Sequence, residues 1–323
     1  MKNASEPNSI YGTKKWSEFI EAVYHYKLFD LKDGSNVVSL AKVNSKIFSN
    51  RLISLPFADY GNIIAKGDAN VLAKKIIDCA IKEKVNYVEI RTPADSVGVL
   101  LEKNGFEKRN DYVTFKLDIT NPTLVLKNAE KRTRNDITKS QKAGFELCSV
   151  ENEVDIEAFY KIYAATMKNL GSPPQSLKFF KKMKEILGEN CQIYLAKLNG
   201  KPVAGAVFLP YNNEVHYAYS CYLREVASLR AVEFLIWNAI VNFSKQGFEK
   251  FDFGRTRYNS GVFTYKKGWG GAETQMPYYY YFLKEKIEQR DEVKYKKLSQ
   301  IWAKILPTPI ANTIGPWLIK QIG

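Results

Sequence analysis

The stretch that decides the fold runs from Phe251 to Gly270 and reads Phe-Asp-Phe-Gly-Arg-Thr-Arg-Tyr-Asn-Ser-Gly-Val-Phe-Thr-Tyr-Lys-Lys-Gly-Trp-Gly. An amphipathic helix is predicted before it, from Leu229 to Gln246, because apolar residues recur there at helical spacing. A strand is predicted after this helix, from Phe248 to Phe253, and another strand is predicted after the stretch, from Pro277 to Leu283. The stretch therefore belongs to a unit of helix, strand, turn and strand.

A similar unit occurs earlier in the chain, displaced by 163 residues. Four positions correspond at this offset: Asp252 to Glu89, Lys266 to Lys103, Gly268 to Gly105 and Trp269 to Phe106. Further upstream, Leu40 to Lys46 resembles Leu195 to Lys201 at an offset of 155. Matches that keep the same order along both halves predict one fold repeated twice.

The predicted fold class is mixed α/β, with α+β character, in two tandem modules. Each module is expected to hold a central, mostly antiparallel mixed sheet flanked by helices. The expected divisions are a first module at 1–120, a basic linker helix and entry to the second module at 121–170, the second module at 171–290, and a C-terminal amphipathic segment at 291–323.

The composition narrows the partners and the compartment. A net charge of +14 indicates an anionic partner, which phosphate-bearing substrates, nucleic acid and an anionic membrane face all satisfy. The four cysteines are widely spaced, and His25 and His216 show no ligand-like spacing to them, so no metal site is predicted. A polar N-terminus, with no run long enough to span a membrane, predicts a cytoplasmic protein.

Three stretches together resemble a known family: Leu52 to Gly61, Phe251 to Thr256 and Phe263 to Gly270. With the module end at Leu100 to Leu117, they resemble the GNAT superfamily, and within it the FemAB-related branch of tandem GNAT proteins. The resemblance covers residues 14–283 and implies two GNAT-like modules. It also implies an acyltransferase, which moves an amino acid from aminoacyl-tRNA or an acyl group from a thioester to an amine of a cell-envelope precursor.

Two departures from that family leave the donor open. The tRNA-dependent peptidoglycan enzymes carry a coiled-coil arm, whereas no heptad run interrupts the second module here. The loop that holds the pyrophosphate of coenzyme A in ordinary GNAT enzymes corresponds to Leu223 to Ala231, which contains no glycine. We therefore expect no tightly bound cofactor, and an acyl thioester such as acyl-CoA or an aminoacyl-tRNA as co-substrate.

Lys266 is the first candidate catalytic residue. Direct attack of an amine on an activated ester or thioester needs a deprotonated amine and fixed donors for the oxyanion, but no nucleophilic side chain. Lys266 precedes a Gly-Trp-Gly turn, and the resemblance places a functional lysine there. Asp59 follows an apolar strand and is the second candidate, expected to position the acceptor amine.

The candidate substrate-binding residues are polar, basic or aromatic and lie near these two positions. They are Tyr60, Asn62, Tyr217, Tyr219, Arg255, Arg257, Tyr265, Lys267 and Trp269. The two arginines follow a strand and are expected to bind phosphate. Tyr265 and Trp269 are expected either to stack on a base or sugar or to fill the core.

The strand predicted from Val215 to Tyr222 lines the cleft with one of its faces. Alternation places Tyr217, Tyr219 and Cys221 on one face and His216 on the other. Either face is compatible with a site. His216 is interpreted first as a hydrogen-bonded structural residue and second as a base.

Two further segments suggest partners. The predicted helix from Asn121 to Lys142 is strongly basic and either binds phosphates or is a solvated linker. The segment Ile301 to Ile322 mixes apolar residues with lysine. It is expected to pack on the body of the protein or to insert shallowly at the inner face of a membrane.

The leading hypothesis is an N-acyltransferase or aminoacyltransferase that acts on an amine of a cell-envelope or surface-glycan precursor. The expected partner is an anionic, phosphate-bearing substrate that is nucleotide-linked or lipid-linked. One alternative is a transferase that depends strictly on aminoacyl-tRNA. The other, from a different class, is a non-catalytic protein that binds RNA or phosphate ligands on decayed modules.

Overall fold

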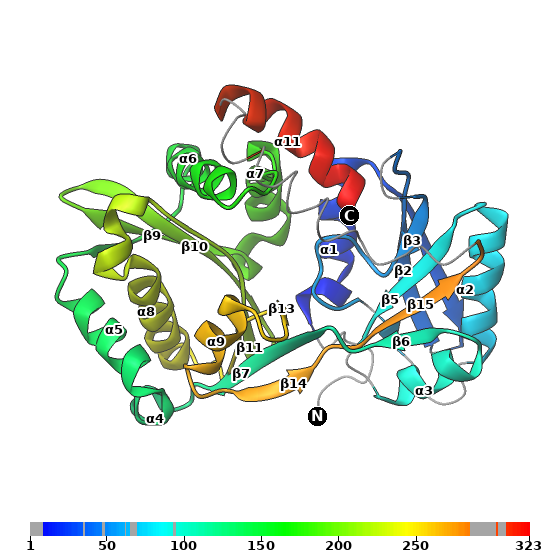
Figure 1. The fold of residues 1–323 in the computed structure, drawn as a ribbon, viewed down its shortest axis with the longest axis horizontal. Coiled ribbons are helices and arrows are strands. Elements are labelled where there is room, and N and C mark those ends of the chain that lie inside the picture. Colours follow the sequence, from blue (N-terminus) through cyan, green and yellow to red (C-terminus); the bar gives the residue numbers. More distant parts are fainter. Residues whose placement is uncertain are drawn as a thin grey trace. The chain divides into compact units, whose positions relative to one another are not determined.

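The computed structural model describes residues 9–34, 36–46, 49–61, 63–64, 70–92, 95–284, 302 and 308–323. The chain forms two compact units (Figure 1). Unit 1 consists of Met1–Val113, Gln275–Asp291 and Trp317–Gly323. Unit 2 consists of Thr114–Thr274 and Glu292–Pro316.

Unit 1 is built on a mixed sheet. Its strand order is β1 (Lys27–Asp33), β2 (Asn36–Val43), β3 (Arg51–Ile53), β5 (Tyr87–Arg91), β15 (Tyr278–Phe282) and β6 (Glu107–Arg109), with β4 (Ile63–Ile64) paired to β2. Neighbours along this order pair antiparallel, except that β3 and β5 pair in parallel. The helices are η1 (Ile10–Gly12), α1 (Lys14–Tyr24), α2 (Asn70–Lys82) and α3 (Asp95–Lys103).

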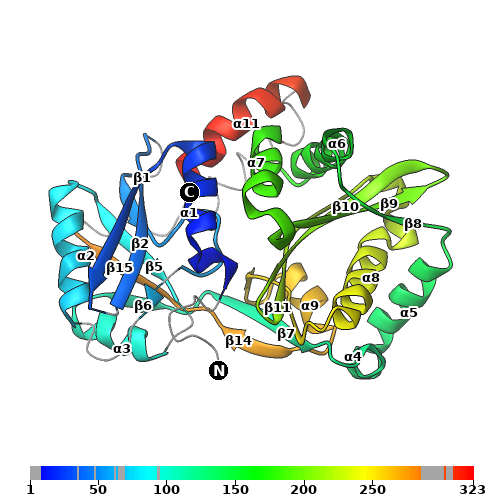
Figure 2. The same cartoon turned by 180° about the vertical axis from the view of Figure 1, so that it is seen from behind.

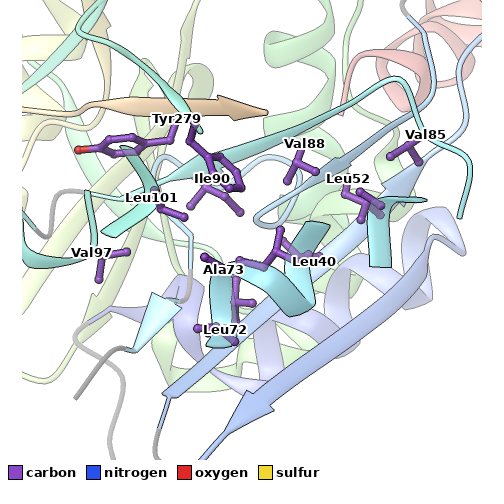
Figure 3. Close-up of a cluster of buried hydrophobic side chains, with 14 residues drawn as sticks. Leu40, Leu52, Leu72, Ala73, Val85, Val88, Ile90, Val97, Leu101 and Tyr279 are labelled. Carbon is purple, nitrogen blue, oxygen red and sulfur yellow. The ribbon is translucent and has the colours of Figure 1, made fainter. Parts of the chain in front are cut away.

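The helix that apolar periodicity predicts from Val71 to Lys84 is α2, and its apolar face belongs to the core of unit 1, but Ile81, expected to face inward, is 58% exposed. Leu72, Ala73, Ile76 and Ala80 are buried and recur at the spacing of one helix face. They belong to one cluster with side chains from the sheet and from α3 (Figure 3). Burial of each large apolar side chain in this cluster contributes about 1.5–3 kcal/mol to the free energy of unfolding.

Unit 2 is also built on a mixed sheet. Its strand order is β13 (Thr256–Arg257), β7 (Tyr112–Asp118), β12 (Lys250–Asp252), β11 (Glu214–Tyr222), β10 (Lys201–Tyr211), β9 (Gln192–Leu198) and β8 (Glu146–Ser149), with β14 (Ala272–Gln275) paired to β7. β11 and β12 pair in parallel, whereas β7 with β12 and the strands from β11 to β8 pair antiparallel. The helices are α4 (Pro122–Asn128), α5 (Lys131–Gln141), α6 (Glu153–Asn169), α7 (Leu177–Leu187), η2 (Gly188–Asn190), η3 (Arg224–Leu229), α8 (Ala231–Lys245) and α9 (Gly261–Lys267).

Helices α6 and α8 cover opposite faces of the sheet of unit 2 (Figures 1 and 2). Gly205 of β10 faces α6, where an added Cβ would lie 2.5 Å from the ring of Phe159. Phe208 of the same strand faces α8 and packs on Phe243, with ring centroids 5.9 Å apart. Glycine at position 205 therefore permits the close approach of α6.

The final strand predicted for each half of the chain pairs within the sheet that the other half mainly forms. β7 comes from the first half of the chain and pairs with β12 in unit 2, while β15 comes from the second half and pairs with β5 and β6 in unit 1. This differs from the expected boundaries at 120 and 290, which keep each strand with its own half. Periodicity identifies a strand, but it does not identify the strand with which it pairs.

The predicted fold class is confirmed, with two mixed sheets flanked by helices, in which the order β1-β2-β3-β5-β15 corresponds to β9-β10-β11-β12-β7. Glu89 lies opposite Ile53 across the parallel pair of unit 1, and Asp252 lies opposite His216 across that of unit 2. The offset of 163 therefore aligns equivalent strands. The offset of 155 is wrong, because it aligns β2 with β9, and β9 is the counterpart of β1.

The predicted basic helix from Asn121 to Lys142 is two helices, α4 and α5. The backbone leaves the helical conformation at Ala129 and Glu130, whose ψ angles are 150° and 152°. The break lets the backbone N–H of Glu130 donate to the carbonyl of Gly268 at 2.8 Å. An added Cβ at Gly270 would lie 2.5 Å from the carbonyl oxygen of Asn128, so the Gly-Trp-Gly turn needs glycine there.

The C-terminal helix α11 (Thr308–Ile322) buries one side and exposes the other. In unit 1, the guanidinium of Arg51 is buried and donates to the carbonyls of Ser49, Gln321 and Ile322. Ile310, Ile314 and Trp317 are exposed on α11, and the membrane hypothesis for this segment stays a prediction. In the described part of the chain, no helix combines the length and the apolar character that crossing a membrane requires.

Arg51→Met should lower the free energy of unfolding of unit 1 by about 3 kcal/mol, because the carbonyls at the end of α11 lose a buried charged donor. Urea unfolding followed by circular dichroism measures the change. Lys82→Met, which removes an exposed cation from α2, is the control and should stay within about 0.5 kcal/mol of the parent. Equal stability of the two variants would contradict this role of Arg51.

Candidate active site

The parallel strands of unit 2 separate partway along their length. β11 and β12 pair only from Glu214–Lys250 to His216–Asp252. β12 ends at Asp252, whereas β11 continues to Tyr222. Beyond His216, this edge of β11 has no strand partner among the described residues. At the end of this edge, the N–H and the carbonyl of Tyr222 bond to the Thr166 hydroxyl of α6, each at 3.1 Å.

A β-bulge at Ala218 changes which side chains of β11 face each side of the sheet. Val207 of β10 pairs with Tyr219, and the adjacent Phe208 pairs with Tyr217, so Ala218 is an extra residue. Tyr217 packs on Phe208 on the α8 side, while Tyr219 contacts Phe179 of α7 on the opposite side. The prediction that Tyr217 and Tyr219 share a face is therefore wrong, because alternation ends at the bulge.

A pocket of about 490 Å³ lies beside this edge of β11. Its walls come from β11, from η3 with the first turn of α8, and from α9. The lining residues are Tyr217, Ala218, Tyr219, Ser220, Tyr222, Ala227, Arg230, Ala231, Val232, Glu233, Phe253, Val262, Tyr265 and Lys266. All of them belong to unit 2.

Lys266 is a buried cation in the wall of this pocket. It lies in the last turn of α9, and only 8% of the residue is exposed. Its Nζ donates to the carbonyl of Gly254 at 2.8 Å and to that of Arg255 at 3.1 Å. These bonds hold the Lys266 ammonium group beside Gly254 and Arg255, which follow β12, at the wall of the pocket.

Glu233 and Tyr265 contribute buried titratable groups to the same pocket. Burial raises the pKa of the Glu233 carboxyl, and the nearby Asp136 charge raises it further against the opposing charge of Arg230. Burial also raises the pKa of Tyr265, to which the charge of Glu233 adds. The Tyr265 hydroxyl is buried and makes no hydrogen bond of standard geometry with the described residues. The pocket wall therefore combines a carboxyl group of raised pKa with the Lys266 ammonium.

The segment expected to correspond to a pyrophosphate loop is a turn of 3₁₀ helix, η3, followed by α8. Arg230 precedes α8 in the left-handed conformation, with φ at 64°. Its Nε donates to Asp136 of α5 at 2.9 Å. The N-terminus of a 15-residue helix therefore meets the pocket beside an arginine, although the loop contains no glycine.

A buried charge cluster lies where β11 and β12 separate. Asp252 is fully buried, with Lys116 Nζ at 3.3 Å and His216 Nδ1 at 3.7 Å from its Oδ2. Burial alone would raise the pKa of Asp252, but His216, Lys116 and the Thr114 hydroxyl together lower it. Lys116 also contacts Glu214 at 2.8 Å. Among the described residues, no group of three or more His, Cys, Asp or Glu side chains is arranged to hold a metal ion.

The buried cysteines are poor nucleophiles. Burial raises the pKa of Cys191 to about 12 and that of Cys221 further. Cys221 lies on β11 and contacts the carbonyl of Gly205 at 3.5 Å. A thiol held in its protonated form does not attack an ester, which agrees with direct attack by an amine.

The structure places four predicted site residues in the pocket wall: Tyr217, Tyr219, Tyr265 and Lys266. Trp269 is fully buried and packs on Phe253, with ring centroids 5.5 Å apart. Lys267 and Arg257 are exposed, and Arg255 is half-buried. None of these last four residues lines the pocket.

Asp59 and Tyr60 belong to unit 1, where both are half-buried after β3. Tyr60 packs edge-on against Tyr11, with ring centroids 5.4 Å apart. Asn62 lies outside the described residues. The roles expected of these three residues stay predictions.

Glu233, Arg230 and Ser220 are pocket residues that the sequence reasoning missed. Glu233 had one signal, because it is a lone acid in the apolar run Ala231 to Ile236 of a helix. Acids are rarely buried in such a run unless they are paired or functional. Arg230 lies in the stretch expected to correspond to a pyrophosphate loop, and Ser220 lies on the strand expected to line the cleft, but neither residue was singled out.

The class of unit 2 follows from its sequence. Residues 127–267, all within unit 2, match the model of the Acetyltransferase (GNAT) domain. This match confirms the predicted resemblance for unit 2 and identifies it as an acyltransferase domain. A GNAT domain uses acyl-CoA or a similar co-substrate. A comparison with curated protein sequences gave no match.

Solved structures share the fold of nearly the whole chain. The crystal structure of FemX is 14% identical, with a TM-score of 0.68, over 92% of this chain and 96% of that chain. The C-terminal domain of a putative lysylphosphatidylglycerol synthetase from Agrobacterium fabrum is 10% identical, with a TM-score of 0.62, over 83% of this chain and 90% of that chain. L-PGS from Bacillus licheniformis is 12% identical, with a TM-score of 0.60, over 94% and 100%. The predicted likeness to the FemAB branch is thereby confirmed for the fold.

Proposed function

We propose that unit 2 transfers an acyl or aminoacyl group from an activated ester or thioester to an amine by direct attack. The observation that carries this proposal is the joint presence of Lys266 and Glu233 in one pocket, beside the part of β11 that extends past β12, in a GNAT domain. The amine nitrogen bonds to the carbonyl carbon, and the carbon–oxygen or carbon–sulfur bond of the donor then breaks.

Lys266 supplies a positive charge opposite the negative charge that the reaction develops on the carbonyl oxygen. Attack on the carbonyl places a negative charge on its oxygen, and a fixed cation in a buried site stabilises that charge. Two backbone carbonyls already orient the Lys266 ammonium, so little reorganisation is needed during the reaction. Backbone N–H groups of β11 beside the pocket are proposed as further donors to the same oxygen.

Glu233 is the proposed base. Its carboxylate accepts the proton that the attacking amine loses, and the protonated acid then returns a proton to the leaving alcohol or thiol. A raised pKa suits both steps, because the group exchanges protons closer to neutral pH than an exposed glutamate does.

The donor is proposed to carry phosphate groups that lie along α5. Lys131, Arg132, Lys139 and Lys142 are exposed on or directly after this helix. Asp136, in the middle of α5, is bound to Arg230 in the pocket wall, so this basic helix lies beside the pocket. Charged tRNA and acyl-CoA both satisfy this arrangement.

The acceptor is proposed to be an amine of a cell-envelope or surface-glycan precursor. The resemblance to the FemAB branch and the shared fold with FemX support this class. The shared fold with lysylphosphatidylglycerol synthetases supports an aminoacyl group as the transferred group. A non-catalytic binding protein is disfavoured, because such a protein does not need a buried lysine and a buried acid in one pocket.

Lys266→Met should lower kcat by roughly 10²–10³-fold and leave the fold intact, because the variant keeps the aliphatic stem but removes the charge that stabilises the oxyanion. Release of the acyl group from acetyl-CoA and from total charged tRNA, with envelope-precursor amines as acceptors, measures the rate. Lys245→Met, at an exposed lysine in the last turn of α8, is the matched control. A Lys266→Met enzyme within about threefold of the parent would remove this assignment.

Glu233→Gln should lower kcat/KM by roughly 10²-fold and abolish the acid limb of its pH dependence. A base acts in its ionised form, so the rate of the parent enzyme falls as pH drops through the raised pKa of Glu233. That limb should lie above the ordinary glutamate value of about 4.3. Glu185→Gln, at an exposed acid of α7, should leave the profile unchanged. A profile that Glu233→Gln does not alter would exclude Glu233 as the base.

A further inference from the structure

The peptide of Gly254 is held on both sides by buried side chains. Its N–H donates to Asp252 Oδ1 at 2.8 Å, and its carbonyl accepts from Thr114 Oγ1 at 3.1 Å. Thr114 Oγ1 also contacts Asp252 Oδ1, so its single hydroxyl proton lies between the carboxylate and the carbonyl. Gly254 has a φ of 71°, a conformation that glycine adopts without strain.

The same carbonyl is a hydrogen-bond acceptor for Lys266. Nζ of Lys266 lies 2.8 Å from the Gly254 oxygen. The position of the ammonium group therefore depends on this oxygen, and the position of the oxygen depends on Thr114 and Asp252. Thr114 and Asp252 do not line the pocket, and Thr114 is only 1% exposed.

We propose that Thr114 and Asp252 are positioning residues for Lys266, which they orient through the Gly254 peptide. This inference rests on the proposed role of Lys266 in the transfer reaction. It also gives β7 a role in the site. Thr114 belongs to β7, which the first half of the chain contributes to unit 2.

The free-energy cost of burying the Asp252 carboxylate supports a role for this residue beyond packing. Asp252 is fully buried, and a buried carboxylate stays charged only if its partners repay the loss of hydration. An apolar pair at positions 114 and 252 would fill the same space at lower cost, but it would leave the Gly254 peptide without its two side-chain contacts. The need to position the Lys266 ammonium group explains why a buried carboxylate is present at position 252.

The test begins with Thr114→Val, which keeps the shape and β-propensity of the side chain but removes the hydroxyl. Competitive labelling of lysines with acetic anhydride, read by mass spectrometry, reports the accessibility and basicity of Lys266 without any substrate. Lys266 should be labelled several-fold faster in Thr114→Val than in the parent, with Lys245 unchanged as the internal reference. Thr114→Ser should restore the parent rate, because serine keeps the hydroxyl.

Turnover provides the second readout. Thr114→Val should lower kcat roughly ten- to hundredfold with little change in KM, because a displaced catalytic group affects the transition state more than binding. In an enzyme that already carries Lys266→Met, Thr114→Val should cause almost no further loss of kcat. Ser39→Ala, which removes a buried hydroxyl bonded to Asp30 in unit 1, is the matched control and should leave kcat unchanged.

Two results would overturn the inference. One is equal labelling of Lys266 in the parent and in Thr114→Val. The other is a loss of kcat of the same size in both backgrounds, which would indicate a general structural effect. Failure of the proposed function gives a different result, since Lys266→Met alone would then keep its turnover.

Discussion

The buried carboxylate of Asp252 is the constraint on which the site in unit 2 depends. It lies at the last paired position of the two parallel strands, and Lys116, His216, Thr114 and the Gly254 N–H surround it. Removal of these partners would leave an uncompensated charge in the interior, which costs about 3–5 kcal/mol. The cluster therefore fixes where the strands separate, and the separation opens the edge of β11 to the pocket.

The two units place a carboxylate at equivalent positions of their sheets but surround it with different residues. Glu89 occupies the position in unit 1 that Asp252 occupies in unit 2, but it lies opposite Ile53 rather than His216. Glu89 is paired with Arg91 at 2.7 Å, and Tyr280 takes the place of Lys116. The carboxylate is kept at the centre of both sheets, while its neighbours differ. The pocket described here, with Lys266 and Glu233, belongs to unit 2.

Local patterns predicted the elements and one catalytic candidate. The spacing of apolar residues identified α2 and α8, and the turn after Lys266 pointed to the α9 end of the pocket. Pairing between distant strands left no local signal, so the exchange of β7 and β15 and the bulge at Ala218 were not predictable. Glu233 was missed because its importance comes from burial, which depends on the packing of α8. Thr114 was missed because it is an ordinary strand residue until Gly254 lies beside it.

We propose that the part of β11 beyond β12 and the adjoining α9 hold the acyl donor. Hydrogen–deuterium exchange of the whole protein, with millimolar acetyl-CoA and with total charged tRNA as separate probes, tests it most directly. We expect slower exchange in residues 217–222 and 261–267 with one of the two probes, and no change in residues 87–91 of unit 1. Protection confined to unit 1, or unchanged exchange along β11 and α9 with both probes, would contradict the account.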